Sequence, residues 1–153
     1  MVGSNPSPKK HQGKNRNPAG APQPMQTIDQ YFKKTQKTIS NSKIVASTHI
    51  EYIKVLENEG YMRGTLTLTD GSELRLLEYA RISNGRAIIL RYRFQWQIAG
   101  ELITRWNNAP HHPEVETFPH HKHVKSEGKP KPSKAKNLIS ILKEIEAKII
   151  SQE

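Results

Sequence analysis

The chain has 153 residues, a formal net charge of +10 at pH 7 and no cysteine. This length suits one domain with a tail, and the lack of cysteine excludes disulfides, thiolate zinc sites and a cysteine nucleophile. The sequence has neither an apolar run of the roughly 20 residues that a membrane helix requires nor a signal-peptide core, so we expect a cytoplasmic protein without membrane contact. Its basic surface favours polyanions, of which nucleic acid is the commonest in the cytoplasm.

Residues 1–26 combine five prolines and three glycines with almost nothing that could be buried. The segment contains no acidic residue, and its basic residues are Lys9, Lys10, Lys14 and Arg16. Such a composition is typical of disordered segments. We therefore predict a disordered basic arm, followed by a folded domain.

A helix is predicted to begin at Thr27, because Thr27 and Gln30 have the spacing of a capping box. Ile28, Tyr31 and Phe32 follow at helical spacing, so one face of this helix is apolar. The same segment, MQTIDQYFKK (25–34), resembles a PIP box, the peptide by which replication proteins dock on the sliding clamp. Those three side chains occupy its aliphatic and paired aromatic positions, although Met25 stands where glutamine is usual. A helix that faces the core needs the same side chains, so both interpretations remain open.

From Ser47 to Trp106 the apolar residues alternate with period two, which predicts β-strands. Asp70-Gly71, Asn84-Gly85 and Ala99-Gly100 supply tight turns, and a further strand is expected at 48–56. Together these segments predict an antiparallel meander of about five strands.

The most regular strand, RAIILRYRFQWQ, is predicted to carry different chemistry on its two faces. One face presents Ile88, Leu90, Tyr92, Phe94 and Trp96, and the other presents Arg91, Arg93, Gln95 and Gln97. A guanidinium group binds phosphate oxygens in pairs, so the polar row resembles a surface for a nucleic-acid backbone. The alternative is a solvated face on which the arginines pair with Glu73 or Glu101. Glu78 falls on an apolar face, so it lies at the sheet rim or has a buried partner.

Residues 127–153 begin with a linker, EGKPKPSK, and end with an amphipathic helix. Its apolar residues at helical spacing are Leu138, Ile141, Leu142, Ile145 and Ile149. The predicted fold is α+β, with an N-terminal helix, the antiparallel meander and a C-terminal helix packed on the sheet. Residues 27–126 and 127–153 are expected to form one domain.

Residues 107–123, NNAPHHPEVETFPHHKH, contain five of the seven histidines. His121 and His123 point the same way if this segment is extended, and His112 and His120 can reach them only through a loop. Imidazole exchanges protons near neutral pH, as RNA cleavage requires, because one group must deprotonate the 2′-hydroxyl and another must protonate the leaving oxygen. A zinc site of three histidines, or of two histidines and a glutamate, is an alternative, although the spacing matches no standard zinc signature. A third possibility is a structural role in packing against the tryptophans.

The stretches GYMRGTLTLTDGSELRLLEY and WNNAPHHPEVETFPHHKH resemble the TumE family of toxins from prokaryotic toxin–antitoxin pairs, over about residues 28–150. The resemblance implies a small cytoplasmic toxin paired with a helix-turn-helix antitoxin, and we extrapolate a ribonuclease activity from it. The positions that match the family are His111, His112, His120, His121 and His123, with Trp106, Asn108 and Pro110 before them and Asp70, Gly71 and Glu78 in the hairpin. The family usually has Trp-Asp-Asn where this chain has Asn107, so an aspartate that would orient a histidine is replaced.

We therefore predict an RNA-cleaving toxin that uses histidine acid–base chemistry, with no metal and no cofactor. The candidate catalytic residues are His112, His121, His123, Arg91 and Arg105, and the candidate substrate-binding residues are Arg93, His111, His120, Glu78, Trp106 and Asn108. The alternative function is a non-catalytic nucleic-acid-binding module, recruited to the sliding clamp through Ile28, Tyr31 and Phe32.

Overall fold

The computed structural model describes residues 3, 24–25 and 27–152. In chain order the elements are α1 (Ile28–Asn41), β1 (Val45–Leu56), β2 (Glu59–Leu68), β3 (Glu73–Ser83), β4 (Arg86–Ile98), β5 (Glu101–Asn107), β6 (His121–Val124), β7 (Lys131–Pro132) and α2 (Leu138–Ile150). Neither helix in this part of the chain is long and apolar enough to cross a bilayer. The basic residues of the predicted disordered arm lie outside the described residues.

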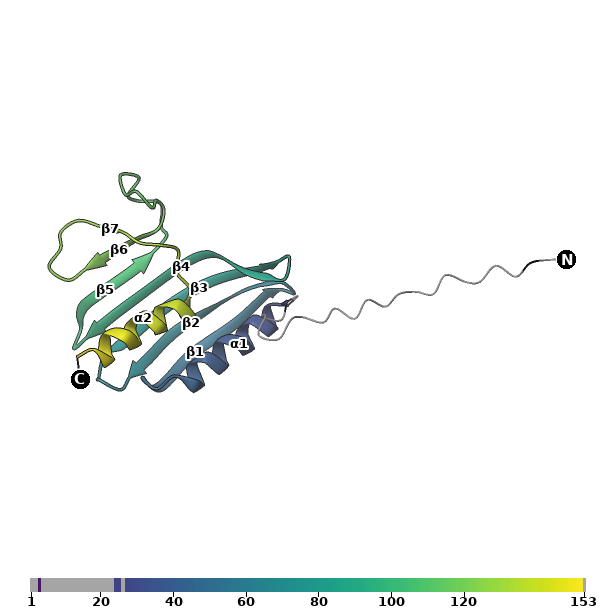
Figure 1. Ribbon diagram of the computed structural model, residues 1–153, viewed down its shortest axis with the longest axis horizontal. Helices are drawn as coiled ribbons and strands as arrows, with labels where there is room; N and C mark the ends of the chain where they lie inside the picture. Colours follow the sequence, from purple (N-terminus) through teal and green to yellow (C-terminus); the bar gives the residue numbers. More distant parts are fainter. Residues whose placement is uncertain (1–2, 4–23, 26, 153) are drawn as a thin grey trace.

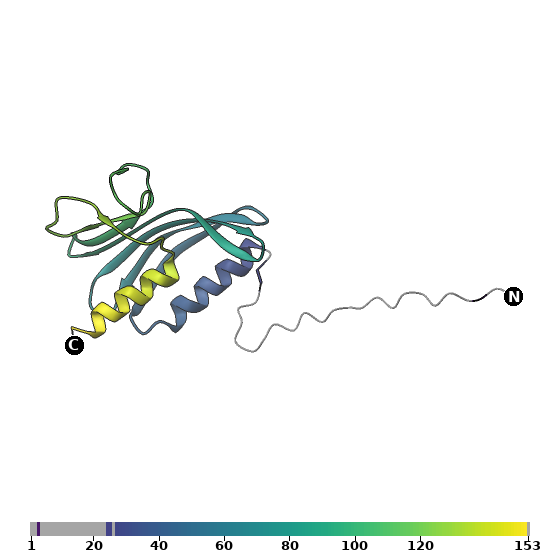
Figure 2. The same cartoon turned by 45° about the horizontal axis from the view of Figure 1, so that its top comes forward.

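The seven strands form one antiparallel sheet in which each strand pairs with the next in sequence. Both helices lie against the same face of this sheet, and no helix of the described chain covers the other face (Figure 1, Figure 2). The predicted α+β fold with a helix at each end is confirmed, but the count of about five strands is wrong. The additional strands are β6, in the histidine-rich stretch, and β7, in the predicted linker. Both are short and polar, so neither has the apolar alternation from which strands are predicted.

The helices begin where their capping residues indicate. The Thr27 hydroxyl accepts a hydrogen bond from the Gln30 backbone at 3.3 Å, and the Thr27 backbone donates to the Gln30 side chain at 3.2 Å. Asn137 and Ser140 make the equivalent exchange at the start of α2. Each helix turns its apolar side to the sheet, and the α1 residues buried there are Ile28, Tyr31, Phe32, Thr35 and Ile39. A sliding clamp could therefore reach the clamp-binding side chains only if α1 left the sheet.

Glu78 joins both helices to the sheet. Its side chain is 1% exposed and accepts hydrogen bonds from the Tyr31 hydroxyl of α1 and, at 2.9 Å, from the backbone nitrogen of Leu138, the first residue of α2. Both donors favour the charged carboxylate, but burial outweighs them and raises the pKa of Glu78 to about 7. Of the two positions expected for this carboxyl, the structure has the one with a buried partner.

The predicted alternation of β4 breaks at Leu90. The consecutive β3 residues Tyr79 and Ala80 pair with Arg91 and Ile89, so Leu90 has no partner in β3 and forms a bulge. A bulge reverses which face each side chain takes on the far side of it. As a result Ile89 packs against the core, whereas Leu90 and Ile88 are exposed. The expectation that Ile88 and Leu90 share a face with the buried aromatic residues of β4 is therefore wrong.

Candidate functional site

The helix-free face of the sheet, which we call the open face, contains a pocket near β5 and β6. Strand pairing aligns Arg93, Asn107 and His121 in one row across β4, β5 and β6, and it aligns Gln95, Arg105 and His123 in the next. Residues in register on neighbouring strands project from the same face, so arginines and histidines from distant parts of the chain meet there. The pocket is lined by Leu77, Arg91, Tyr92, Arg93, Arg105, Asn107, Ala109, His111, His112, His121 and His123.

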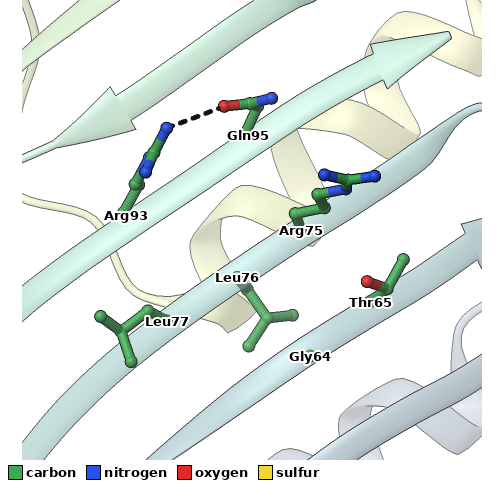
Figure 3. Close-up of a pocket in the computed structure, with 7 residues that line it drawn as sticks. All are labelled: Gly64, Thr65, Arg75, Leu76, Leu77, Arg93 and Gln95. Carbon is green, nitrogen blue, oxygen red and sulfur yellow. Dashed lines mark hydrogen bonds between the residues drawn. The ribbon is translucent and has the colours of Figure 1, made fainter. Parts of the chain in front are cut away.

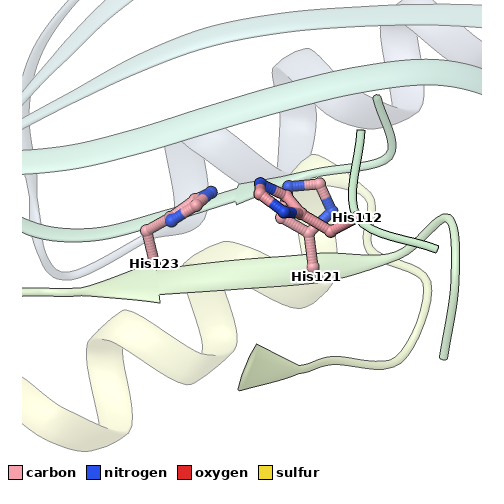
Figure 4. A group of neighbouring side chains, drawn as sticks. All are labelled: His112, His121 and His123. Carbon is pink, nitrogen blue, oxygen red and sulfur yellow. The ribbon is translucent and has the colours of Figure 1, made fainter. Parts of the chain in front are cut away.

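Three of these histidines converge. His121 and His123 project from the same side of β6, and His112 approaches from the loop of residues 108–120 (Figure 4). The ring centroids lie 5.0, 5.5 and 5.2 Å apart for the pairs 112–121, 112–123 and 121–123. One ring nitrogen from each histidine lies within 4.8 Å of the other two. The residues predicted as proton-transfer groups therefore form one cluster, which we call the histidine cluster.

Hydrogen bonds fix which nitrogen carries the proton in two of the rings. His121 Nδ1 lies 2.9 Å from the carbonyl oxygen of Pro119, and His112 Nδ1 lies 3.1 Å from a carboxylate oxygen of Glu114. A carbonyl or carboxylate oxygen can only accept, so each Nδ1 donates and each Nε2 is left with its lone pair or with a transferable proton. Burial, together with the positive charge of Arg105, lowers the pKa of His123, so its imidazole is mostly neutral at pH 7.

The pocket arginines have no carboxylate partner among the described residues. Glu73 and Glu101, the partners considered from the sequence, interact instead with Gln97 and with Lys125. Arg93 donates to the neighbouring Gln95 at 3.2 Å, and the two side chains lie along the open face. The charges of Arg91, Arg93 and Arg105 are therefore available to an anionic ligand.

A second hollow of the open face adjoins this pocket, and Figure 3 shows the residues that line it. It is lined by Gly64, Thr65, Arg75, Leu76, Leu77, Arg93 and Gln95, and it shares Leu77 and Arg93 with the histidine pocket. Arg75 and Arg93 thus extend the cationic surface across β3 and β4. Sequence reasoning missed Arg75, although its place between the buried residues Leu74 and Leu76 assigns it to the open face.

Several residues predicted to bind substrate lie away from the cluster. Trp106 is fully buried on the helix side of the sheet, where the Lys148 ammonium lies 5.9 Å from its ring centroid. Glu78 also lies on that side, where it holds Tyr31 and Leu138. His120 stacks on Tyr92 with ring centroids 5.8 Å apart. These three residues stabilise the domain in positions that the open-face pocket does not reach, whereas His111 lines the pocket without joining the cluster.

Two asparagines shape the loop that carries His112. Asn108 accepts from the Tyr92 backbone at 2.9 Å and donates to the Leu90 carbonyl at 3.1 Å, so it satisfies the backbone beside the β4 bulge. Asn107 accepts from the Ala109 backbone at 3.0 Å and lies opposite His121 in the β5–β6 pairing. An aspartate at position 107 would keep this acceptor and would add a negative charge to the pocket wall.

The fold and the pocket describe a small basic α+β protein with a cationic, histidine-containing site on an open sheet face. Residues 35–150 match the family model described as Toxin TumE, so the chain belongs to the TumE toxin family. The matched segment includes every strand, α2 and all three residues of the histidine cluster. No curated protein and no solved structure matches the chain. Membership of a toxin family implies an antitoxin partner.

Proposed function

We propose that this toxin binds and cleaves RNA in the pocket of the open face. The observation that supports the proposal most strongly is the placement of Arg91, Arg93 and Arg105, none paired with a carboxylate in the described chain, beside three convergent histidines. A phosphodiester needs cations to hold its charge and groups that can move protons at its 2′ and 5′ oxygens. The pocket provides both kinds of group within one surface.

The arginines bind the phosphates. Arg91, Arg93 and Arg105 line the same pocket as the histidine cluster, and Arg75 lines the adjoining hollow. This arrangement accommodates a single strand that runs across β3, β4 and β5, with the scissile phosphate at the histidines. Contacts of this type carry little sequence information, so target choice requires further contacts or a partner.

The histidines move the protons. His123 is the candidate base, because its lowered pKa keeps the imidazole neutral and able to accept the proton of the 2′-hydroxyl. The 2′-oxygen then attacks the phosphorus, and the bond to the 5′-oxygen breaks. His112, whose Nδ1 faces Glu114, is the candidate acid that gives a proton to that oxygen. His121 lies at a similar distance from both rings and completes the cluster. The products are a 2′,3′-cyclic phosphate and a 5′-hydroxyl, and no metal ion takes part.

The antitoxin blocks this same face. We propose a helix-turn-helix partner with an acidic segment that covers Arg91 and Arg93, because carboxylates there would take the positions of the phosphates. Covering either the arginines or the histidine cluster would prevent RNA from reaching the other.

The test compares cleavage of a short single-stranded RNA by the full chain and by matched variants. His123→Ala is expected to slow cleavage on the order of 100-fold, the usual contribution of one acid–base group. Arg105→Ala is expected to slow it to a similar extent, because it removes a cation that stabilises the developing charge. His49→Ala and Arg81→Ala, which change the same residue types outside the pocket, should cleave at the rate of the unchanged chain. Equal rates for all variants would refute the proposal. RNA binding without cleavage in the unchanged chain would support the non-catalytic module instead.

A further inference from the structure

We infer that His112, His121 and His123 also form a binding site for a divalent transition-metal ion of the zinc class. Their ligand nitrogens lie within 4.8 Å of one another, from a strand and a loop that meet only in the fold. In a tetrahedral zinc site, metal–nitrogen distances of about 2.0–2.1 Å place the ligand nitrogens about 3.3 Å apart. Each ring would have to move inward by less than about 1 Å to reach that geometry.

Two of the three histidines have the hydrogen-bond acceptor that is typical of histidine metal ligands. A histidine ligand almost always donates its other ring N–H to a carbonyl or a carboxylate, which fixes the tautomer and the ring orientation. The Pro119 carbonyl does this for His121, and the Glu114 carboxylate does it for His112. In both residues this contact uses Nδ1 and leaves Nε2 for the ion.

The types of ligand select the class of metal. Three imidazoles, with no carboxylate among the converging atoms, suit zinc, copper, nickel or iron rather than magnesium or calcium, which prefer oxygen ligands. Three protein ligands leave one tetrahedral position open, and that position faces a pocket that Arg91, Arg93 and Arg105 also line. These cations oppose a bare metal ion but favour an anion, such as hydroxide or a phosphate oxygen, as its fourth ligand.

Bound metal has a consequence for activity that rests on the proposed function. Coordination occupies the ring nitrogens that would accept and donate protons during RNA cleavage, so the metal-bound chain should be an inhibited form. Metal binding itself needs no RNA and can be measured without it.

Binding is tested by titrating Zn²⁺, and Co²⁺ as a coloured substitute, into the full chain without an affinity tag. We expect one equivalent to bind, with the visible absorption of tetrahedral Co²⁺ and a raised melting temperature. His112→Ala and His123→Ala should weaken binding at least about 100-fold, because even a residue behind a ligand contributes about 10–100-fold. His112 lies on a loop and is partly exposed, so this variant should fold even if variants of the buried His121 do not.

His49→Ala is the matched control, because this histidine lies outside the cluster and its replacement should leave metal affinity unchanged. Equal affinity in His112→Ala, His123→Ala and the unchanged chain would overturn the metal site, whatever the RNA results. Adding Zn²⁺ should suppress RNA cleavage by the unchanged chain and EDTA should restore it. Stimulation by bound Zn²⁺ would overturn the inhibitory role and the metal-free mechanism, and would leave the site itself in place.

Discussion

Replacing Glu78 with glutamine is expected to remove a pH-dependent loss of stability. Burial raises the pKa of Glu78 from 4.5, its ordinary value, to about 7 in the folded chain. Between these two values the folded state keeps a proton that the unfolded state has released. The contribution of Glu78 to the free energy of unfolding is therefore greatest below pH 4.5 and is lost as the pH rises through 7. At about 1.4 kcal/mol per pKa unit, the loss is about 3 kcal/mol.

Glutamine has nearly the same shape and cannot ionise. Its oxygen can accept from the Leu138 backbone, and its amide can donate to the Tyr31 hydroxyl, which replaces both contacts of the carboxyl. Urea unfolding at several pH values gives the free energy for each protein. Relative to the unchanged chain, Glu78→Gln should gain about 3 kcal/mol between pH 4.5 and pH 8. All other ionisable groups are the same in both proteins, so their contributions cancel in this comparison.

Tyr31→Phe provides a second perturbation of the same group. It removes a donor that favours the charged carboxylate, so it should raise the pKa of Glu78 further and move the loss of stability to higher pH. The reasoning would be refuted if the free energies of unfolding of Glu78→Gln and of the unchanged chain differed by the same amount at every pH from 4.5 to 8. It would mean that the two donors, together with the N-terminus of α2, keep the buried carboxylate charged.

Three further substitutions or truncations test other parts of the structure. Phe32→Ala should lower the free energy of unfolding, measured in urea, by roughly 3–5 kcal/mol, because the residue is 6% exposed and its ring lies 5.3 Å from that of Tyr52. Loss of sliding-clamp affinity at unchanged stability would instead favour the docking peptide. Asn108→Ala should cost about 1–3 kcal/mol in the same assay, because two backbone groups at the β4 bulge lose their partner; unchanged stability would show that water replaces the asparagine at no cost. A chain that begins at Met25 lacks four cations, so its slope of log RNA affinity against log salt concentration should be smaller by up to about 3. An unchanged slope would mean that the arm does not contact RNA.

The elements with a strong periodic signal were predictable from the sequence. The capping box at Thr27, helical spacing and period-two alternation with three glycine-containing turns predict both helices and the five longer strands. The alternation of β4 puts Arg91 and Arg93 on the open face. β6 was not predictable as a strand, because a sequence such as HKHV has no apolar alternation and pairs only because β5 offers it an edge. The bulge at Leu90 was equally hidden, since it depends on the pairing with β3 and on the side chain of Asn108.

The candidate site was also predictable from the sequence only in part. The sequence indicated that His121 and His123 share a side, but the approach of His112 depends on how a loop of proline and polar residues folds. The sequence also did not separate the pocket histidines from His120, which precedes β6 and stacks on Tyr92. Trp106 and Glu78 match the family pattern, and the structure places both in the interior between sheet and helices. A match to the family pattern therefore does not tell whether a residue lines the pocket or belongs to the core.

The chemical nature of the RNA ends made in the presence of EDTA tests the central claim most directly. The measurement uses a short RNA labelled at its 5′ end, the full chain, and His123→Ala as the matched variant. We predict cleavage in EDTA that leaves a 2′,3′-cyclic phosphate and a 5′-hydroxyl, and a rate on the order of 100-fold lower in the variant. No cleavage in EDTA, with activity restored by Zn²⁺ and a 3′-hydroxyl on the product, would contradict the account, because a metal-bound hydroxide would then be the nucleophile.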